Sequence, residues 1–197
     1  MENVMSGMAR RAQRLCLCLC SGVLLSGCLS SAASASKVTE QDLAVMKAVL
    51  ESEECQRTGE KPHVVSDAPA PLARRRFPDD WDPTGGLTAA AVKRSEQNLH
   101  WPAMDVCAGR AIVSHAAVEA TFDTDRKPPG WEKFEKTFPN TAGVMQVSLP
   151  VFSKDDKRAF VYLDWKCGVL CGAGFYLELQ ETNAGWRVIT KKNAWIS

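Results

Sequence analysis

Two kinds of hydrophobic periodicity divide the chain. Between Thr39 and Phe138, apolar residues recur mainly at the three- and four-residue spacing of helices. After Asn140 the spacing changes to the two-residue alternation of strands. The pattern therefore predicts helices followed by strands, which is the order of an α+β fold.

Four short helices are expected before Asn140. Residues 111–122 also fit a strand, but Ser114 as a cap, with Val118 and Phe122 one turn apart, favours a helix there. The expected helices run from Thr39 to about Glu54, from Thr88 to about Leu99, behind Ser114 within 111–122, and from Trp131 to Phe138.

A four-stranded antiparallel meander is expected after Asn140, because turn residues separate the strand-like runs. Leu177 and Leu179 alternate with Glu178 and Gln180, as in a strand with one solvated face. We therefore expect the upstream helices to cover one face of the sheet. The runs are Gly143–Phe152, Arg158–Trp165, Gly172–Gln180 and Trp186–Ile196.

Residues 56–86 are expected to form a loop within a single domain at 38–197. Half of the chain's 10 prolines fall in this segment. Proline lacks a backbone donor and restricts its preceding residue, so regular elements are disfavoured there.

The N-terminus has the pattern of an export signal. Arg10, Arg11 and Arg14 precede an apolar run at 15–25 that is shorter than the roughly 20 residues of a membrane-crossing helix. The run ends in Leu25-Ser26-Gly27-Cys28, which resembles the lipobox of bacterial lipoproteins.

This resemblance implies that residues 1–27 are a signal peptide and that Cys28 carries lipid, including palmitate. It places the protein in the bacterial cell envelope, on the outer membrane or on the periplasmic face of the inner membrane. Residues 28–37 are small and polar and are expected to form a flexible tether. The alternative is an ordinary secretory signal in which the cysteine occurs by chance. Translation can start at Met1, Met5 or Met8.

The mature chain contains four cysteines besides Cys28, and disulfides are the default in an exported protein. Cys167 and Cys171 flank a turn that contains Gly168, so a bridge across a hairpin end is sterically reasonable. Cys55 and Cys107 would then pair. Four cysteines still allow three pairings.

The C-terminal part is similar to a group of bacterial exported proteins, and this resemblance implies no activity. The helix-then-meander order also looks like the cystatin or nuclear transport factor 2-like layout, an analogy of architecture alone. The similarity rests on Trp131-x-x-Phe134, Phe138-Pro139, Gly143, Ser148, Phe152, Ala159-x-Val161-Tyr162, Cys167-Gly168-x-Leu170-Cys171-Gly172-x-Gly174, Gly185-Trp186-x-Val188 and Trp195-Ile196-Ser197.

Composition and charge narrow the function classes. Hydrophobic residues make up 45% of the chain and charged residues 24%, which is ordinary for a folded protein. The formal net charge is +1, so no basic surface for nucleic acid is expected.

Three kinds of chemistry remain open. A thiol-redox protein would use Cys167 and Cys171, although their spacing is not the Cys-x-x-Cys of thioredoxin-like sites. A hydrolase would use His115 with Glu119 one turn away and Cys107 or Ser148 as nucleophile. A metal site would add histidines to the thiols, but His63, His100 and His115 lack ligand spacing.

We favour a binding or envelope-associated module over an enzyme, with no cofactor and no metal. The membrane, through the lipid anchor, is the first expected partner. Trp165, Phe175 and Tyr176 could form an exposed aromatic face for an envelope protein, a peptide or a glycan. If that face is covered, these side chains belong to the core.

Overall fold

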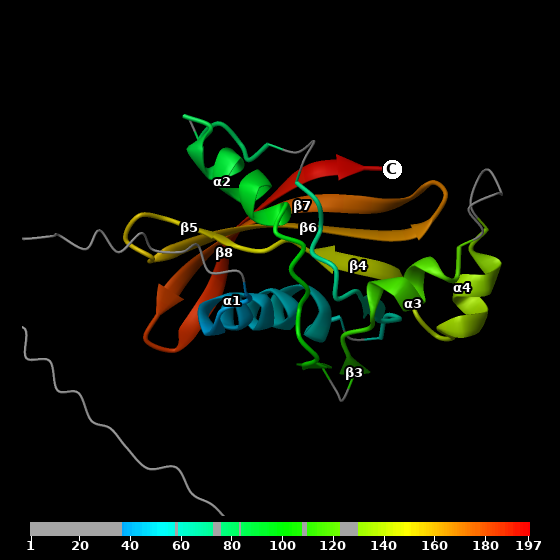
Figure 1. The fold of residues 1–197 in the computed structure, drawn as a ribbon. Helices are drawn as coiled ribbons and strands as arrows, with labels where there is room; N and C mark the ends of the chain where they lie inside the picture. The colour runs from blue at the N-terminus through cyan, green and yellow to red at the C-terminus, as the bar shows by residue number, and fades with distance from the viewer. Residues whose placement is uncertain (1–36, 58, 73–75, 83, 108–109, 123–129) are drawn as a thin grey trace, which may run out of the picture. The chain divides into compact units, whose positions relative to one another are not determined.

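The computed structural model describes residues 37–57, 59–72, 76–82, 84–107, 110–122 and 130–197 (Figure 1). The predicted signal peptide, Cys28 and nearly all of the predicted tether lie outside these residues. Among the described residues, no helix has the length and apolar character needed to cross a membrane.

The first helix, α1 (Glu40–Leu50), begins with a reciprocal cap. Thr39 Oγ1 accepts a hydrogen bond from the Asp42 N–H at 3.2 Å, and Asp42 Oδ2 accepts one from the Thr39 N–H at 2.8 Å. The same face of the helix carries Val45, Met46 and Val49, which are completely buried. The helix continues as one wider turn, η1 (Glu51–Cys55), so the sequence correctly predicted a helical segment up to this point.

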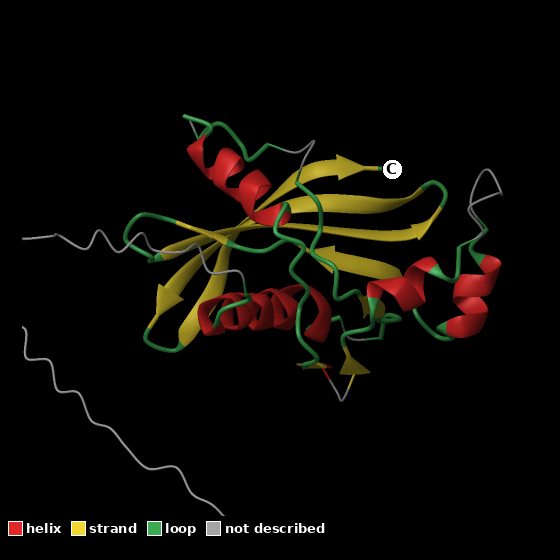
Figure 2. Cartoon of the chain, in the orientation of Figure 1, coloured by secondary structure: helices red, strands yellow, loops and turns green. Residues whose placement is uncertain are grey.

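A mixed sheet packs beside α1 (Figure 2). Its strand order is β1-β4-β6-β7-β8, and β5 also pairs with β6. The strands are β1 (His63–Val65), β4 (Gly143–Val147), β5 (Val151–Phe152), β6 (Arg158–Gly168), β7 (Cys171–Thr182) and β8 (Gly185–Ile196). A separate antiparallel pair is formed by β2 (Asp105–Val106) and β3 (Arg110–Ala111).

The α+β class is confirmed, but the simple four-stranded meander is not. The hairpins β6–β7 and β7–β8 follow the expected antiparallel order. The run 143–152 is split, because Ser148 and Pro150 interrupt it between β4 and β5. The proline-rich segment, expected to be loop, supplies β1, which runs parallel to β4 with His63 opposite Gly143. Three residues are too few to show a strand period in the sequence.

Helical and loop segments cover both faces of the sheet, not one as the sequence suggested. On the α1 face, Val161, Leu163 and Leu177 are completely buried. The opposite face is covered by 70–72, by 76–82 and by α2 (Gly86–Ser95), where Phe77 and Leu72 are buried. Glu178 is therefore buried instead of solvated, and it forms an ion pair with Arg158.

Two more helices lie at the other end of this second face. They are α3 (His115–Glu119) and α4 (Glu132–Thr137), which confirms the expected helices behind Ser114 and around Phe134. Phe134 is buried between the rings of Trp131 and Phe138, at centroid distances of 5.2 and 5.1 Å. Val64 of β1 and Val118 of α3 complete this small cluster.

Helix α2 begins at Gly86, two residues before Thr88, which the sequence predicted as its cap. Asp82 accepts hydrogen bonds from the backbone N–H groups of Leu87 at 3.0 Å and Thr88 at 2.7 Å. Arg94, near the end of α2, donates to Asp42 Oδ2 at 2.5 Å and to the Pro150 carbonyl at 2.6 Å. This arginine therefore links α2 to α1 and to the connection between β4 and β5.

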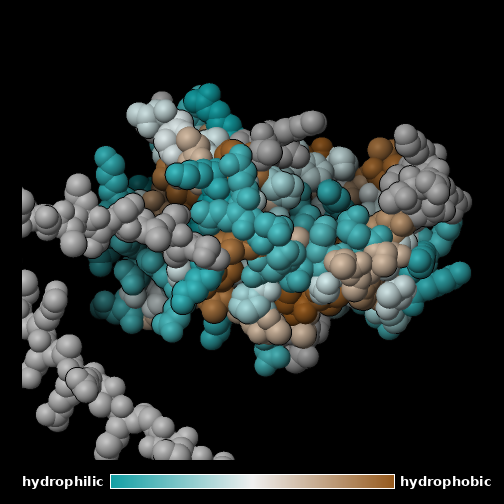
Figure 3. Space-filling view, in the orientation of Figure 1, coloured by the Kyte–Doolittle hydropathy of each residue, from teal (hydrophilic) through white to brown (hydrophobic). Residues whose placement is uncertain are grey.

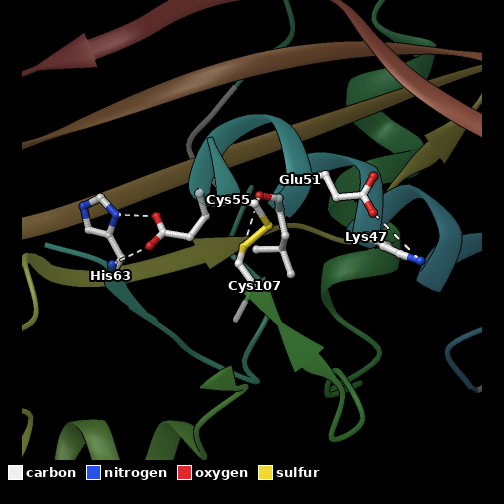
Figure 4. The surroundings of a disulfide bond; sticks show 7 residues. Lys47, Glu51, Cys55, His63 and Cys107 are labelled. Carbon is white, nitrogen blue, oxygen red and sulfur yellow. Dashed lines mark hydrogen bonds and ion pairs between the residues drawn. A yellow bond between two sulfur atoms is a disulfide. The ribbon is translucent and has the colours of Figure 1, made fainter. Parts of the chain in front are cut away.

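Both expected disulfides are present in the structure. Cys55 bonds to Cys107 across 52 positions, and Cys167 bonds to Cys171 across four. Beside the first disulfide, the Glu54 carboxylate accepts hydrogen bonds from the His63 backbone N–H at 2.7 Å and contacts His63 Nδ1 at 2.9 Å (Figure 4). Glu54 therefore fixes the start of β1 against the end of η1.

Candidate ligand cavity beside the Cys167–Cys171 turn

A cavity of about 380 Å³ opens on the second face of the sheet, between α3 and the ends of β4 and β6. Its size is within the usual range of small-molecule sites. Residues from segments far apart in the chain line it: His115, Val118, Glu119, Phe122, Trp131, Val144, Gln146, Lys166, Gly168 and Val169.

Strand alternation brings the sheet residues of this cavity together. Val144 lies opposite Lys166 in the β4–β6 pairing, and Gln146 lies opposite Asp164. Since alternate residues point to the same face, Val144, Gln146 and Lys166 share one face. The rings of Phe122 and Trp131 meet edge to face at 4.9 Å on the helical side. The cavity therefore combines an apolar floor with a few polar groups.

His115 is held by two contacts from the segment that follows β1. Its backbone N–H donates to Asp67 Oδ1 at 2.6 Å. Its ring Nδ1 lies 3.3 Å from the hydroxyl oxygen of Ser66, a completely buried residue. The histidine therefore has a fixed backbone and a fixed ring nitrogen on its inner side.

The hydroxyl of Ser66 faces Nδ1 of His115. Its oxygen accepts the Ala68 N–H at 3.2 Å and lies 3.3 Å from Nδ1, and because a hydroxyl can both donate and accept, this contact holds the ring in either tautomer. Glu119 Oε1 lies 3.8 Å from Nε2, so the carboxylate favours the tautomer with its proton on Nε2.

Two other polar side chains line the cavity. Gln146 Nε2 donates to the Ala68 carbonyl at 3.2 Å, which fixes the amide orientation. Lys166 is exposed and forms no ion pair with any residue that the structure describes. The acidic group of the site, Glu119, thus lies beside His115, whereas Lys166 has no ion-pair partner among the described residues.

The disulfide-closed turn forms one wall of the cavity. Gly168 and Val169 line it, and the α carbons of Cys167 and Cys171 are 5.1 Å apart. Val169 is 56% exposed and Leu170 is 84% exposed, although both are apolar. Hydrophobic surface is visible at this hairpin tip in Figure 3. The disulfide therefore holds two aliphatic side chains in solvent beside the opening.

The three aromatic residues proposed as a binding face do not share one surface. Trp165 and Phe175 lie on the α1 face and pack against its core. Tyr176 is on the opposite face and is buried with Phe77 and Tyr162. The aromatic residues that line the cavity are Phe122 and Trp131.

The nucleophiles considered for a hydrolase are not available at His115. Cys107 is bonded to Cys55, and Ser148 is buried between β4 and β6, where its hydroxyl accepts the Tyr162 N–H at 2.9 Å. Ser66 is the hydroxyl beside His115, and no sequence pattern links the two because 49 positions separate them. Its complete burial leaves it an orienting group for the imidazole.

The three histidine rings have different partners. His63 pairs with Glu54, His100 Nδ1 lies 3.5 Å from Asp67 Oδ1, and His115 lines the cavity. In the described parts of the chain, no three His, Cys, Asp or Glu side chains form a group that could hold a metal ion.

Acidic residues near α2 have structural partners. A hydrogen bond from the Lys192 ammonium lowers the pKa of Asp80. Burial by itself raises the pKa of Asp82, but hydrogen bonds from Thr88 and Leu87 outweigh it and lower the pKa below 3.8. Asp82 therefore caps α2, and Asp80 contacts β8 through Lys192.

Comparison with protein-family models, with curated proteins and with solved structures finds no match to this chain.

Proposed function

We propose that this protein is a lipid-anchored binding protein of the bacterial cell envelope and that its ligand site is the cavity beside the Cys167–Cys171 turn. The cavity itself is the observation that carries the binding role. It is open, it is largely apolar, and its few polar groups come from different elements. This combination is typical of small-molecule and peptide-end sites.

The sequence supports the anchor. The basic start, the short apolar run and the box ending at Cys28 occur in the order of a lipoprotein signal. Two or more acyl chains hold a protein stably on a membrane, whereas one chain binds only marginally. A small polar tether before the folded body would let the cavity face the periplasm or the cell exterior.

Radiolabelled palmitate tests the anchor. Wild-type protein expressed in a Gram-negative host should incorporate the label and partition with membranes, and Cys28→Ala should do neither. Cys16→Ala, within the apolar run, is the matched control and should remain labelled. Incorporation of palmitate by the Cys28→Ala variant would refute lipidation at this residue.

Amide chemical-shift mapping of the mature protein tests the binding role. A fragment library of small acids, amides, amines and neutral apolar compounds should contain members that shift the amides of Val144, Gln146 and Lys166. Val144→Trp should fill the cavity and abolish these shifts, whereas Ile189→Trp on exposed β8 should not. If no fragment in the library shifts the amides that line the cavity, the proposal is wrong.

A thiol-redox protein is the second candidate, because Cys171 is exposed and its turn lines the cavity. In that role, an incoming dithiol would be oxidised to a disulfide while Cys167–Cys171 is reduced to two thiols. Equilibration with dithiol buffers measures the reduction potential. A potential below about −300 mV indicates a structural disulfide, and a higher value supports the redox role.

A further inference from the structure

We infer that the cavity selects a carboxylate attached to an apolar body, an assignment that rests on the proposed binding function and specifies its ligand. The argument has two parts: the hydrogen-bond and charge properties of the polar side, and the shape of the apolar side.

The polar side presents donors. Ser66 contacts Nδ1 of His115, so Nε2 is the ring nitrogen left for other contacts, and the Glu119 carboxylate 3.8 Å away favours a proton there. Lys166 adds an ammonium group with three donors. Carboxylate oxygens only accept hydrogen bonds, so they match this pair, whereas an ammonium ligand would have to bind Glu119.

The charges also favour an anion at Lys166. Glu119 Oε1 lies 3.8 Å from His115 Nε2, so the carboxylate has a ring nitrogen beside it. Lys166 has no ion-pair partner among the described residues. An incoming anion therefore completes an ion pair at Lys166.

The apolar side accommodates a compact hydrophobic group. Phe122 and Trp131 offer an edge-to-face pair, and Val118, Val144 and Val169 contribute aliphatic surface. Burying such a group yields roughly 25 cal/mol for each Å² removed from water, so most of the affinity comes from this side and the carboxylate provides selectivity.

Two sources share this chemistry: a free aliphatic or aromatic acid, and the C-terminus of a peptide whose last residue is apolar. Four probes separate them: octanoate, octanamide, the tripeptide Ala-Ala-Leu, and the same tripeptide with an amidated C-terminus. Calorimetry and amide shift mapping on the mature, disulfide-bonded protein give affinity and location.

At least one carboxylate probe should bind at the cavity about tenfold more tightly than its amide partner, the ratio expected for one charge-assisted hydrogen bond. Lys166→Met keeps the length of the side chain and should remove this preference. Lys154→Met, in the turn before β6, is the matched control and should retain it. Tighter binding of octanoate identifies a free acid, and tighter binding of Ala-Ala-Leu identifies a peptide end.

Equal binding of an acid and its amide overturns the carboxylate assignment while leaving the cavity as a binding site. If neither carboxylate probe binds, the carboxylate assignment is also wrong. The proposed binding function would still stand if other fragments shift the cavity amides. A preference that survives in Lys166→Met contradicts the role of this lysine. If no fragment and no probe shifts the amides that line the cavity, the binding function itself is rejected.

Discussion

Ser66 and His115 are 49 positions apart in the chain, yet Ser66 Oγ lies 3.3 Å from His115 Nδ1. The parallel bridge between Ser66 and Val113 brings their segments together. A buried hydroxyl thus sets the orientation of an imidazole at the edge of a cavity.

The neutral imidazole of His115 should carry its proton on Nε2. Long-range proton–nitrogen correlation spectra at alkaline pH report the tautomer directly. Ser66→Ala removes the donor to Nδ1 and should raise the fraction with the proton on Nδ1. Ser114→Ala is the neighbouring control, because the Ser114 side chain makes no capping hydrogen bond. A wild-type ring protonated mainly on Nδ1 would disprove the assignment.

The two disulfides should contribute unequally to stability. In the loop-entropy model, a bridge across 52 positions is worth about 4 kcal/mol and one across four about 2 kcal/mol. Urea unfolding of the variants Cys55→Ser/Cys107→Ser and Cys167→Ser/Cys171→Ser measures both losses. A larger loss of stability from removing the short bridge would show that it does more than restrict the unfolded chain.

Asp82→Asn should destabilise the protein by about 1 kcal/mol at neutral pH, because the cap of α2 loses its charge. The folded-state pKa of Asp82 is lowered, so its contribution is present above the unfolded value of 3.8 and is lost as pH falls through the folded value. The difference between wild type and variant should therefore shrink in acid. Exposed Asp79→Asn should change stability little at any pH.

Gly174→Ala should cost about 1–3 kcal/mol through overpacking. An added Cβ would lie 2.1 Å from Trp195 Nε1 and 2.7 Å from the Tyr162 hydroxyl. These two groups are hydrogen bonded to each other at 2.7 Å, so neither moves without a loss. Gly86→Ala, at the start of α2, meets only Thr84 Oγ1 at 3.4 Å and should be neutral or stabilising. Equal urea midpoints for the two variants would contradict this packing argument.

Local chemistry determined the elements that the sequence predicted correctly. Thr39 and Asp42 cap a helix with each other, so four residues are enough to locate its start. Trp131, Phe134 and Phe138 gather on one side of α4 through their spacing alone. The Cys167–Cys171 bridge spans a single turn. The lipid anchor at Cys28 was also inferred from local sequence, and it stays a prediction.

The errors concern contacts between distant segments. β1 has only three residues and pairs parallel with a strand 80 positions later, at His63 and Gly143. Asp82 reaches forward to cap α2, which moves its start before Thr88. Glu178 has the sequence pattern of a solvated residue, but α2 and the segment before it cover that face.

Spacing within single segments was enough to predict the α+β class and the antiparallel hairpins. The four cysteines still allowed three pairings, and the fold selected one of them by bringing Cys55 beside Cys107 and Cys167 beside Cys171. The tertiary structure decided the cavity. Its walls come from α3, β4, β6 and the turn at Gly168 and Val169, and its histidine is oriented by Ser66. The burial of a side chain and the tautomer of a histidine depend on neighbouring residues, and these neighbours come together only when the chain has folded.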